Sequence, residues 1–291
     1  MKVYRAYGYL IASEIPLALP IATTSVSNSD VRIRVGEVIE ADDVLIRTID
    51  NLMKFSISRG GMVTVEILND TRIKFIASVL RGEIISAYLR WQGYLVIHAS
   101  AVFIPPKVIA FMGISGSGKS TTALKCLKHV HNCKIITDDI LPLKVLHDKV
   151  YAVPSFPKVR IWNSVKDEVW GESVSVSNIH ETSKKLEIPI GSKFSRKSNT
   201  LDSIFLLNGY SENDDVRIEG VSKLDALKFI VSQVWSRGIT EDKSDEAQDL
   251  KNIARMLNVV DVFKIKRSNK IDRASKMISA IMEIRGLSNK T

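Results

Sequence analysis

The pattern of apolar and polar positions predicts a first part of the chain that is rich in β-strands. Residues 31–35 alternate apolar and charged side chains with a period of two, as a half-buried strand does. Residues 62–68 and 71–76 flank an Asn-Asp pair and together predict a β-hairpin. Over residues 76–89 the apolar spacing lengthens to that of a helix, and we place a domain boundary near Tyr88.

Beyond this helix the pattern mixes strands with helices. Strands are predicted over residues 94–104, 108–112, 134–140, 201–207 and 259–265. Helices are predicted over residues 122–129, 221–234, 245–257 and 272–285. The Ser/Lys-rich segment 172–199 has little periodicity and is expected to be exposed. We therefore predict a small β-rich domain over residues 1–88, followed by an α/β domain with C-terminal helices over residues 89–291.

Composition adds limits to this picture. The 291 residues are 45% hydrophobic and 25% charged, which is ordinary for a globular protein. No apolar stretch approaches the roughly 20 residues that span a bilayer, so no membrane segment is expected. The two cysteines, Cys126 and Cys133, do not form a disulfide framework, and a cytoplasmic protein is the simplest interpretation.

The net charge of +9 indicates either an acidic partner or a solvated basic surface. Basic residues spread along the chain, with clusters at residues 184–185 and 193–197. There is no basic stripe interleaved with aromatic residues and no nucleic-acid module signature. The charge pattern therefore argues against nucleic acid as the partner.

Residues 113–121 match the phosphate-loop pattern G-x-x-x-x-G-K-[ST]. The candidate nucleotide-binding residues are Gly113, Ile114, Ser115, Gly116, Ser117, Gly118, Lys119, Ser120 and Thr121. In such a loop backbone N–H groups surround the phosphates, the lysine reaches the β- and γ-phosphates, and the hydroxyl after it binds Mg²⁺. The strand predicted before the loop and the helix predicted after it would aim a helix N-terminus at a phosphate. We therefore expect ATP or GTP binding, the alternative being a Gly/Ser-rich turn between two core elements.

Two adjacent carboxylates are the next candidates. Asp138 and Asp139 end an apolar strand about twenty residues after Lys119. Ligands collect at the carboxyl ends of strands, so one aspartate is expected to hold Mg²⁺ with Ser120 and the other to take a proton from a substrate hydroxyl. The alternative is an ordinary turn with one aspartate capping and one solvated.

Two further residues remain open at this point. His98 lies inside an apolar run, where a histidine is commonly a hydrogen-bonded core residue. Arg160 is either a bidentate phosphate ligand or a residue at a strand edge. The other histidines have no metal-ligand spacing.

Four segments, in this order and spacing, resemble the HPr kinase/phosphorylase-like family: residues 97–101, 113–121, 137–139 and 154–162. Residues 4–13 look like the N-terminal strand pair of a shorter branch of that family, whose members accompany peptide-modification genes, including those for lasso peptides. The resemblance implies a fold related to phosphoenolpyruvate carboxykinase and the transfer of phosphate from ATP to a serine hydroxyl.

The resemblance also implies roles for single residues. Asp139 matches the family's proton acceptor, Lys119 the phosphate-loop lysine and Ser120 a magnesium ligand. His98 matches an active-site histidine, and Asp138 would lie beside the metal. Arg160 keeps its place as a candidate phosphate clamp.

The chain departs from the family at one signature. Where full-length members carry Glu-Ile-Arg-Gly, this chain has Lys-Val-Arg-Ile at residues 158–161. Because Lys158 cannot ligate Mg²⁺, metal binding is expected to depend on Ser120, Asp138 and ATP, and the family's reverse phosphorolysis is not expected. The HPr-docking helix is not recognisable, so HPr is not the expected substrate.

The leading hypothesis from the sequence is an ATP- and Mg²⁺-dependent kinase that phosphorylates a serine of a peptide or small protein. Asp139 would act as the base, and the basic stretch 184–197 would hold an acidic or carboxylate-bearing peptide, such as a substrate C-terminus. The alternatives are an ATP-gated binding module without phosphate transfer and a kinase for a small molecule such as free serine.

Overall fold

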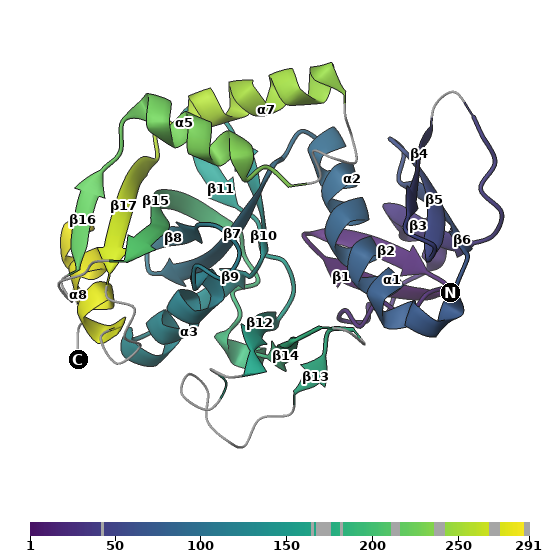
Figure 1. The fold of residues 1–291 in the computed structure, drawn as a ribbon, viewed down its shortest axis with the longest axis horizontal. Coiled ribbons are helices and arrows are strands. Elements are labelled where there is room, and N and C mark those ends of the chain that lie inside the picture. Colours follow the sequence, from purple (N-terminus) through teal and green to yellow (C-terminus); the bar gives the residue numbers. More distant parts are fainter. Residues whose placement is uncertain are drawn as a thin grey trace.

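The computed structural model describes residues 1–41, 44–163, 166, 176–180, 183–210, 216–235, 242–267 and 274–287. Within these residues the chain forms a mixed α/β fold with sheets of six, eight and three strands, which confirms the predicted α/β class, while the kinase-like core and the separate N-terminal domain stay predictions. The six-stranded and eight-stranded sheets lie apart, with helices α1 Ile73–Val79 and α2 Ile85–Trp91 between them (Figure 1). The boundary placed near residue 88 stays a prediction.

The six-stranded sheet is built from the first 67 residues in the order β1-β2-β3-β6-β5-β4. Its strands are β1 Lys2–Ala6, β2 Tyr9–Ser13, β3 Val31–Val35, β4 Val44–Ile49, β5 Met53–Ser58 and β6 Met62–Ile67. Alternate residues of β5, namely Met53, Phe55 and Ile57, are fully buried, so one face of the sheet is apolar.

A continuous helical run covers this apolar face. It consists of α1 Ile73–Val79, a π-helical turn Leu80–Ile84 and α2 Ile85–Trp91. Helix residues such as Ile76 and Leu80 share one core with the sheet, and the same core reaches Phe156 of the second part. The run therefore packs between the two larger sheets, as Figure 1 shows.

The hairpin predicted across residues 62–76 is wrong. Strand β6 pairs instead with β5 before it, and the chain turns at Gly61, whose φ is +82°. Asn69 Oδ1 accepts a hydrogen bond from the Thr71 backbone N–H at 3.0 Å and caps a 3₁₀ turn that leads into α1. The Asn-Asp pair thus starts a helix, because the same side chains that favour turns also cap helices.

The eight-stranded sheet has the order β11-β10-β7-β8-β15-β17-β16, and β9 also pairs with β7. Its strands are β7 Leu95–Ile104, β8 Lys107–Met112, β9 Lys134–Thr137, β10 Ile140–Val145, β11 Val150–Ala152, β15 Asn199–Tyr210, β16 Arg217–Gly220 and β17 Asp261–Arg267. Strands β8, β15 and β17 are parallel neighbours, so their carboxyl ends meet at one edge.

Helices cover both faces of this sheet. They are α3 Lys119–His129, α5 Lys223–Ser232, α7 Lys243–Met256 and α8 Ala274–Ile284. Helices α5 and α7 contribute to one apolar core, and α3 and α8 to the other. All four helices were predicted, although residues 272–273 of the last prediction lie outside the described part of the chain.

A small third sheet comprises β12 Lys158–Trp162, β13 Ser177–Asn178 and β14 Lys185–Pro189. The expectation that residues 172–199 are exposed is therefore wrong for β14, where Glu187 and Ile188 are buried. Residues 172–175 and 181–182 of that segment lie outside the described part of the chain.

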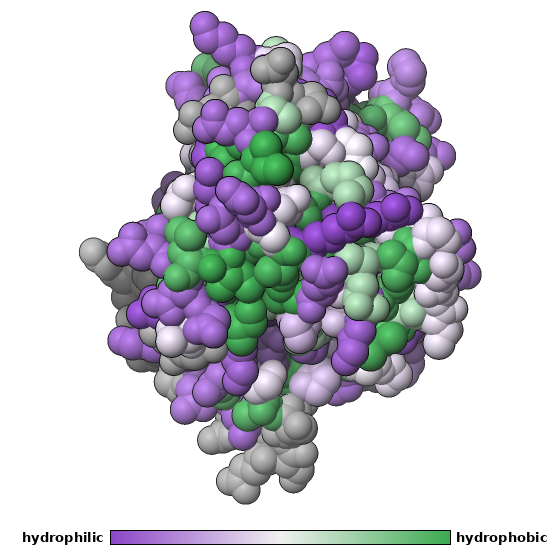
Figure 2. Space-filling model, turned by 90° about the vertical axis from the view of Figure 1, so that its right-hand side faces the viewer, coloured by the Kyte–Doolittle hydropathy of each residue, from purple (hydrophilic) through white to green (hydrophobic). Residues whose placement is uncertain are grey.

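Figure 2 views the molecule from the side of the six-stranded sheet, where apolar side chains gather near the centre of a mostly polar face. Exposed apolar side chains of the first 73 residues include Ile21, Val35, Ile39, Met62 and Leu68. Among the described residues, no helix is both long enough and apolar enough to cross a membrane.

Candidate functional site

The loop at residues 113–118 connects β8 to α3 in a shape that depends on glycine. A Cβ atom on Gly113 would lie 2.4 Å from Ser117 Oγ and 2.9 Å from the Leu207 carbonyl oxygen. Gly118 has φ +85°, a left-handed conformation that glycine adopts without steric cost, and it immediately precedes the first residue of α3. The sequence thus folds into the strand, glycine-rich loop and helix expected around residue 119.

Lys119 folds back onto this loop. Its Nζ donates hydrogen bonds to the carbonyl oxygens of Gly113 at 2.8 Å and Ile114 at 3.2 Å. Burial lowers the pKa of the Lys119 ammonium, while the nearby charges of Asp139 and Asp138 oppose this shift. The ammonium is therefore bonded to the loop and attracted by the charges of both aspartates.

Strand β7 brings the aspartates to the loop. It pairs with β8 on one side and with β9 and β10 on the other. Thr137 pairs with Ala101 and Ile140 with His98, so β9 and β10 keep one register across the two aspartates between them. Asp139 has φ +77°, a left-handed value that is uncommon outside glycine. At the two aspartates the backbone therefore bends out of the regular strand conformation, between the end of β9 and the start of β10.

Asp139 is held from two sides. Its Oδ1 lies 2.9 Å from His98 Nε2, and its Oδ2 accepts a hydrogen bond from Arg160 NH1 at 2.7 Å. Burial alone would raise the pKa of Asp139, but the hydrogen bond from His98 and the charge of Arg160 outweigh burial and lower it well below its usual value. Because Asp139 is ionised, His98 Nε2 carries the proton that it donates.

Asp138 is more deeply enclosed. It accepts hydrogen bonds from Ser100 Oγ at 2.5 Å and from the Arg160 backbone N–H at 2.7 Å, and Ser120 also hydrogen-bonds its carboxylate. Burial and the neighbouring charge of Asp139 raise the pKa of Asp138, while these hydrogen bonds oppose the rise. Ser120 and Asp138 are thus in direct contact.

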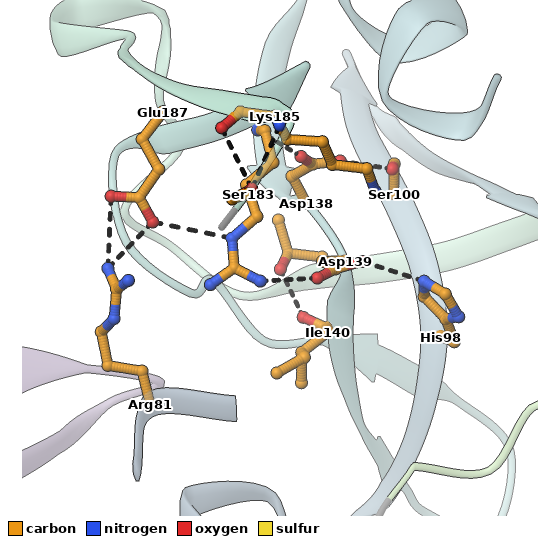
Figure 3. A network of polar contacts seen from close by, with 11 residues as sticks. Arg81, His98, Ser100, Asp138, Asp139, Ile140, Ser183, Lys185 and Glu187 are labelled. Carbon is orange, nitrogen blue, oxygen red and sulfur yellow. Dashed lines mark hydrogen bonds and ion pairs between the residues drawn. The ribbon is translucent and has the colours of Figure 1, made fainter. Parts of the chain in front are cut away.

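The third sheet closes the site with a network of charges (Figure 3). Arg160 of β12 lies opposite Glu187 of β14, with its Nε 3.6 Å from Glu187 Oε1. Lys158 Nζ lies 3.1 Å from Glu187 Oε2. Arg81, from the π-helical turn before α2, reaches the same carboxylate at 2.9 Å.

Burial of Glu187 would raise its pKa, but the charges of Arg81, Lys158 and Arg160 outweigh burial and lower it. One buried carboxylate therefore joins the helical run of the first part to the residues around Asp139.

The predicted site residues include two groups that the structure separates. Lys119, Ser120, Asp138, Asp139, His98 and Arg160 come together around the end of β8, directly or through one neighbour. Ile114, Ser115 and Gly116 form the exposed outer part of the loop. Arg160 contacts the two aspartates, and its role as a phosphate clamp stays a prediction.

Ser120 and Asp138 fit Mg²⁺ by their chemistry, because hydroxyl and carboxylate oxygens are its preferred protein ligands. The described residues contain no cluster of three or more His, Cys, Asp or Glu side chains that could hold a metal without other ligands. A metal here would thus need further oxygen ligands, as Mg²⁺ commonly takes from substrate phosphates and water.

Sequence reasoning missed four residues of this site. Ser100 could have been identified from the sequence, because it lies two residues after His98 on the same predicted strand and residues two apart on a strand share a face. Glu187 fell in a segment expected to be exposed, and Arg81 in the other predicted domain. Arg267, at the end of β17, donates to the Ser117 carbonyl oxygen, and only the parallel neighbours β8, β15 and β17 explain its approach to the loop.

No family model matches the chain, and no curated protein matches it. Among solved structures it is similar to the Hpr(Ser) kinase/phosphatase from Coxiella burnetii, with a TM-score of 0.32 and 11% sequence identity. The matched region covers 66% of this chain and 93% of that chain. At this TM-score the two structures share only part of their arrangement, so the proposed function rests on the residues of this chain.

Proposed function

We propose that the protein is an ATP- and Mg²⁺-dependent kinase that transfers the γ-phosphoryl group to a hydroxyl, with a serine of a peptide or small protein as the favoured acceptor. The observation that carries the proposal is that a phosphate-type loop lies beside two carboxylates with different hydrogen-bond partners. Asp138 contacts Ser120 of the loop, and Asp139 lies near Lys119. The preference for serine comes from the resemblance of four sequence segments.

Nucleotide binding would use the loop amides and Lys119. The Lys119 ammonium now donates to two loop carbonyl oxygens, and the same donors would turn to phosphate oxygens. Mg²⁺, held by Ser120 and Asp138, would neutralise charge on the phosphates. Arg267 would keep the loop in shape through its hydrogen bond to Ser117.

Asp139 would receive the acceptor hydroxyl. Each of its oxygens already accepts one hydrogen bond, and a carboxylate has lone pairs for about four. A carboxylate with a lowered pKa is a weak base, so its main contribution is to orient the hydroxyl and to take its proton late. Phosphoryl transfer through a loose transition state needs positioning and charge stabilisation more than a strong base.

The test follows labelled ATP into a panel of serine-containing peptides and free serine. Lys119→Ala is expected to weaken ATP binding, and Asp139→Asn to lower the transfer rate on the order of 100-fold or more while ATP still binds. Asp148→Asn and Lys149→Ala, in the exposed turn between β10 and β11, are matched controls expected to leave both quantities unchanged.

Three outcomes contradict the proposal. Unchanged ATP affinity in Lys119→Ala would show that the loop does not bind ATP. Near-native phosphate transfer in Asp139→Asn would show that Asp139 does not accept the proton. ATP binding without transfer to any member of the panel favours the ATP-gated binding module instead.

A further inference from the structure

The small third sheet has one apolar face and one charged face. Val159 and Ile161 of β12 are buried in the same core as helix α3. Side chains alternate along a strand, so their neighbours project from the opposite face. That face carries Lys158, Arg160 and Trp162 of β12 with Lys185 and Glu187 of β14. Because Arg160 donates to Asp139 at 2.7 Å, the charged face borders the carboxylate proposed to receive the acceptor hydroxyl.

The cations of this face differ in how they are paired. Lys158 and Arg160 both form ion pairs with Glu187. The Lys185 Nζ lies instead 5.6 Å from the centroid of the Trp162 ring, and no carboxylate of the residues that the structure describes forms an ion pair with it. An ammonium has three N–H donors and no acceptor. Lys185 can therefore bind an anionic group without the loss of an existing ion pair.

The ring beside Lys185 is open to solvent. Trp162 is 40% exposed, although it lies two residues after Arg160 on the same strand. Tryptophan is enriched among the residues that dominate binding interfaces, because its large rigid ring buries much surface at a low cost in side-chain freedom. A cation beside such a ring forms a contact surface for a chain that carries a negative charge.

The strand register gives the spacing between this surface and the reactive carboxylate. Arg160 lies opposite Glu187, and Trp162 lies opposite Lys185. Two residues along a strand span about 7 Å, so the Lys185–Trp162 pair lies about that far from the pair that includes Arg160. An extended peptide advances about 3.3–3.6 Å per residue. A peptide whose serine lies at Asp139 would thus place a residue one or two positions away beside Lys185.

We propose that the acceptor peptide lies along the charged face of the third sheet and is recognised by a carboxylate within two residues of its serine. Lys185 binds that carboxylate, and the Trp162 ring packs against the peptide chain. The inference rests on the proposed kinase function and specifies the class of acceptor that its site takes.

The test compares three short peptides that share one central serine. The first has Asp two residues before and two residues after the serine and an amidated end, and the second has Asn at both positions and the same end. The third has Asn before the serine and ends two residues after it with a free carboxylate. The wild-type KM is expected to be about tenfold lower for the first or the third peptide than for the second, the effect of one hydrogen bond between charged groups. A preference for the first identifies a side-chain carboxylate, and a preference for the third identifies the chain end.

Substitutions of Lys185 assign this preference to its charge. Lys185→Gln is expected to remove the preference, and Lys185→Arg to keep it, with the KM for ATP unchanged in both. Lys184→Gln is the matched control, because it makes the same change in net charge at the adjacent exposed position. Lys185→Glu is expected to favour a peptide with Lys in place of Asp, a reversal that a loss of folding does not produce.

Trp162→Ala tests the role of the ring. The KM for the preferred peptide is expected to rise about threefold, while the KM for ATP stays within twofold. A rise in the KM for ATP alone would assign the ring to the nucleotide base and would contradict its role in acceptor binding.

Equal KM values for the three peptides in the wild type overturn the inference and leave the proposed function standing. A carboxylate preference that survives in Lys185→Gln, or that Lys184→Gln reduces equally, also overturns it. A wild type that binds no ATP and phosphorylates none of the serine acceptors removes the proposed function, and this inference with it.

Discussion

At the scale of single residues, the adjacent carboxylates Asp138 and Asp139 have pKa values that move in opposite directions. Asp138 is buried among neutral donors, whereas Asp139 faces a histidine and an arginine. Neighbouring carboxyl groups in different environments commonly take different roles in one reaction. Asp138 thus contacts the loop serine, whereas Asp139 remains ionised and accessible to a hydroxyl.

The loop glycines offer a residue-scale prediction. Gly113→Ala is expected to weaken ATP binding more than tenfold and to destabilise the fold by about 1–3 kcal/mol, because its Cβ has no room beside Ser117 and the Leu207 backbone. Gly116→Ala is the matched variant, because a Cβ there meets nothing within 4 Å and only its φ of +83° opposes the change. It is expected to cost about 1 kcal/mol.

Calorimetric titration with ATP and thermal denaturation of both variants provide the measurement. Equal losses in the two variants would contradict the steric explanation, because only the first has a blocked position.

The residues that the sequence predicts best are those whose spacing is local. Lys119 and Ser120 follow from one continuous motif, and the aspartates follow from their place at a strand end. The contact of His98 with Asp139 depends on how β7 pairs with β10, which no short motif encodes. Glu187 and Arg81 lie 106 positions apart, and only tertiary packing brings them together.

At the scale of elements, helix α8 is attached to the large sheet by ion pairs. Arg285, just after α8, donates to Asp202 of β15 at 2.7 Å and to Asp261 of β17 at 2.7 Å. Lys107 of β8 lies 3.3 Å from Asp202. Burial opposes the charged form of Asp202, but Arg285 and Lys107 outweigh it and lower its pKa.

This lowered pKa predicts a pH-dependent contribution to stability. A carboxyl group whose pKa is lower in the folded state stabilises the protein above its unfolded pKa near 3.9, and the contribution disappears as the pH falls through the folded value. Asp202→Asn is expected to lower the free energy of unfolding by roughly 1 kcal/mol at pH 7, a modest value because water partly screens the group.

Urea denaturation from pH 7 down to pH 3 measures the effect. The gap between Asp202→Asn and the wild type should narrow on acidification, and a gap that stays constant with pH would count against the ion-pair explanation.

The elements themselves were predictable where the apolar period is long and regular. Helices α5, α7 and α8 and strands β7, β8, β15 and β17 follow their patterns. The segment 71–76 became a helix start because Asn69 caps it, and β14 escaped notice because it is short and carries Lys185 and Glu187. Short or charged elements gain their stability from tertiary partners, which a local pattern does not contain.

At the scale of the whole molecule, the first part of the chain contributes to the site through Arg81. Its bond to Glu187 leaves that carboxylate shared among three cations, one of which is Arg160. Without Arg81, the carboxylate would attract Arg160 more strongly and weaken the hold of Arg160 on Asp139. The helical run between the two large sheets is therefore coupled to the reactive carboxylate by charge.

This coupling predicts the effect of Arg81→Met, which keeps much of the side-chain volume. The turnover rate of phosphate transfer is expected to fall about tenfold, and the free energy of unfolding by about 1–3 kcal/mol, with the KM for ATP unchanged. Arg59→Met is the control, because the Arg59 pair with Asp242 is 57% and 47% exposed. Steady-state kinetics decide the matter, and a change in turnover no larger than that of the control would refute the coupling.

The pairing of strand β7 has a consequence for how the protein can be assayed. His98 and Ser100 share one face of the strand, while Ile97 and Ala99 occupy the other. A slip of one residue against β10 would exchange these faces and offer both aspartates an aliphatic surface. Under the proposed function, a slipped chain would keep its secondary structure yet be catalytically silent. The turnover rate per protein molecule would then measure the fraction of a refolded sample in which β7 has its native register. A circular dichroism spectrum cannot distinguish the two forms, because they have the same secondary structure.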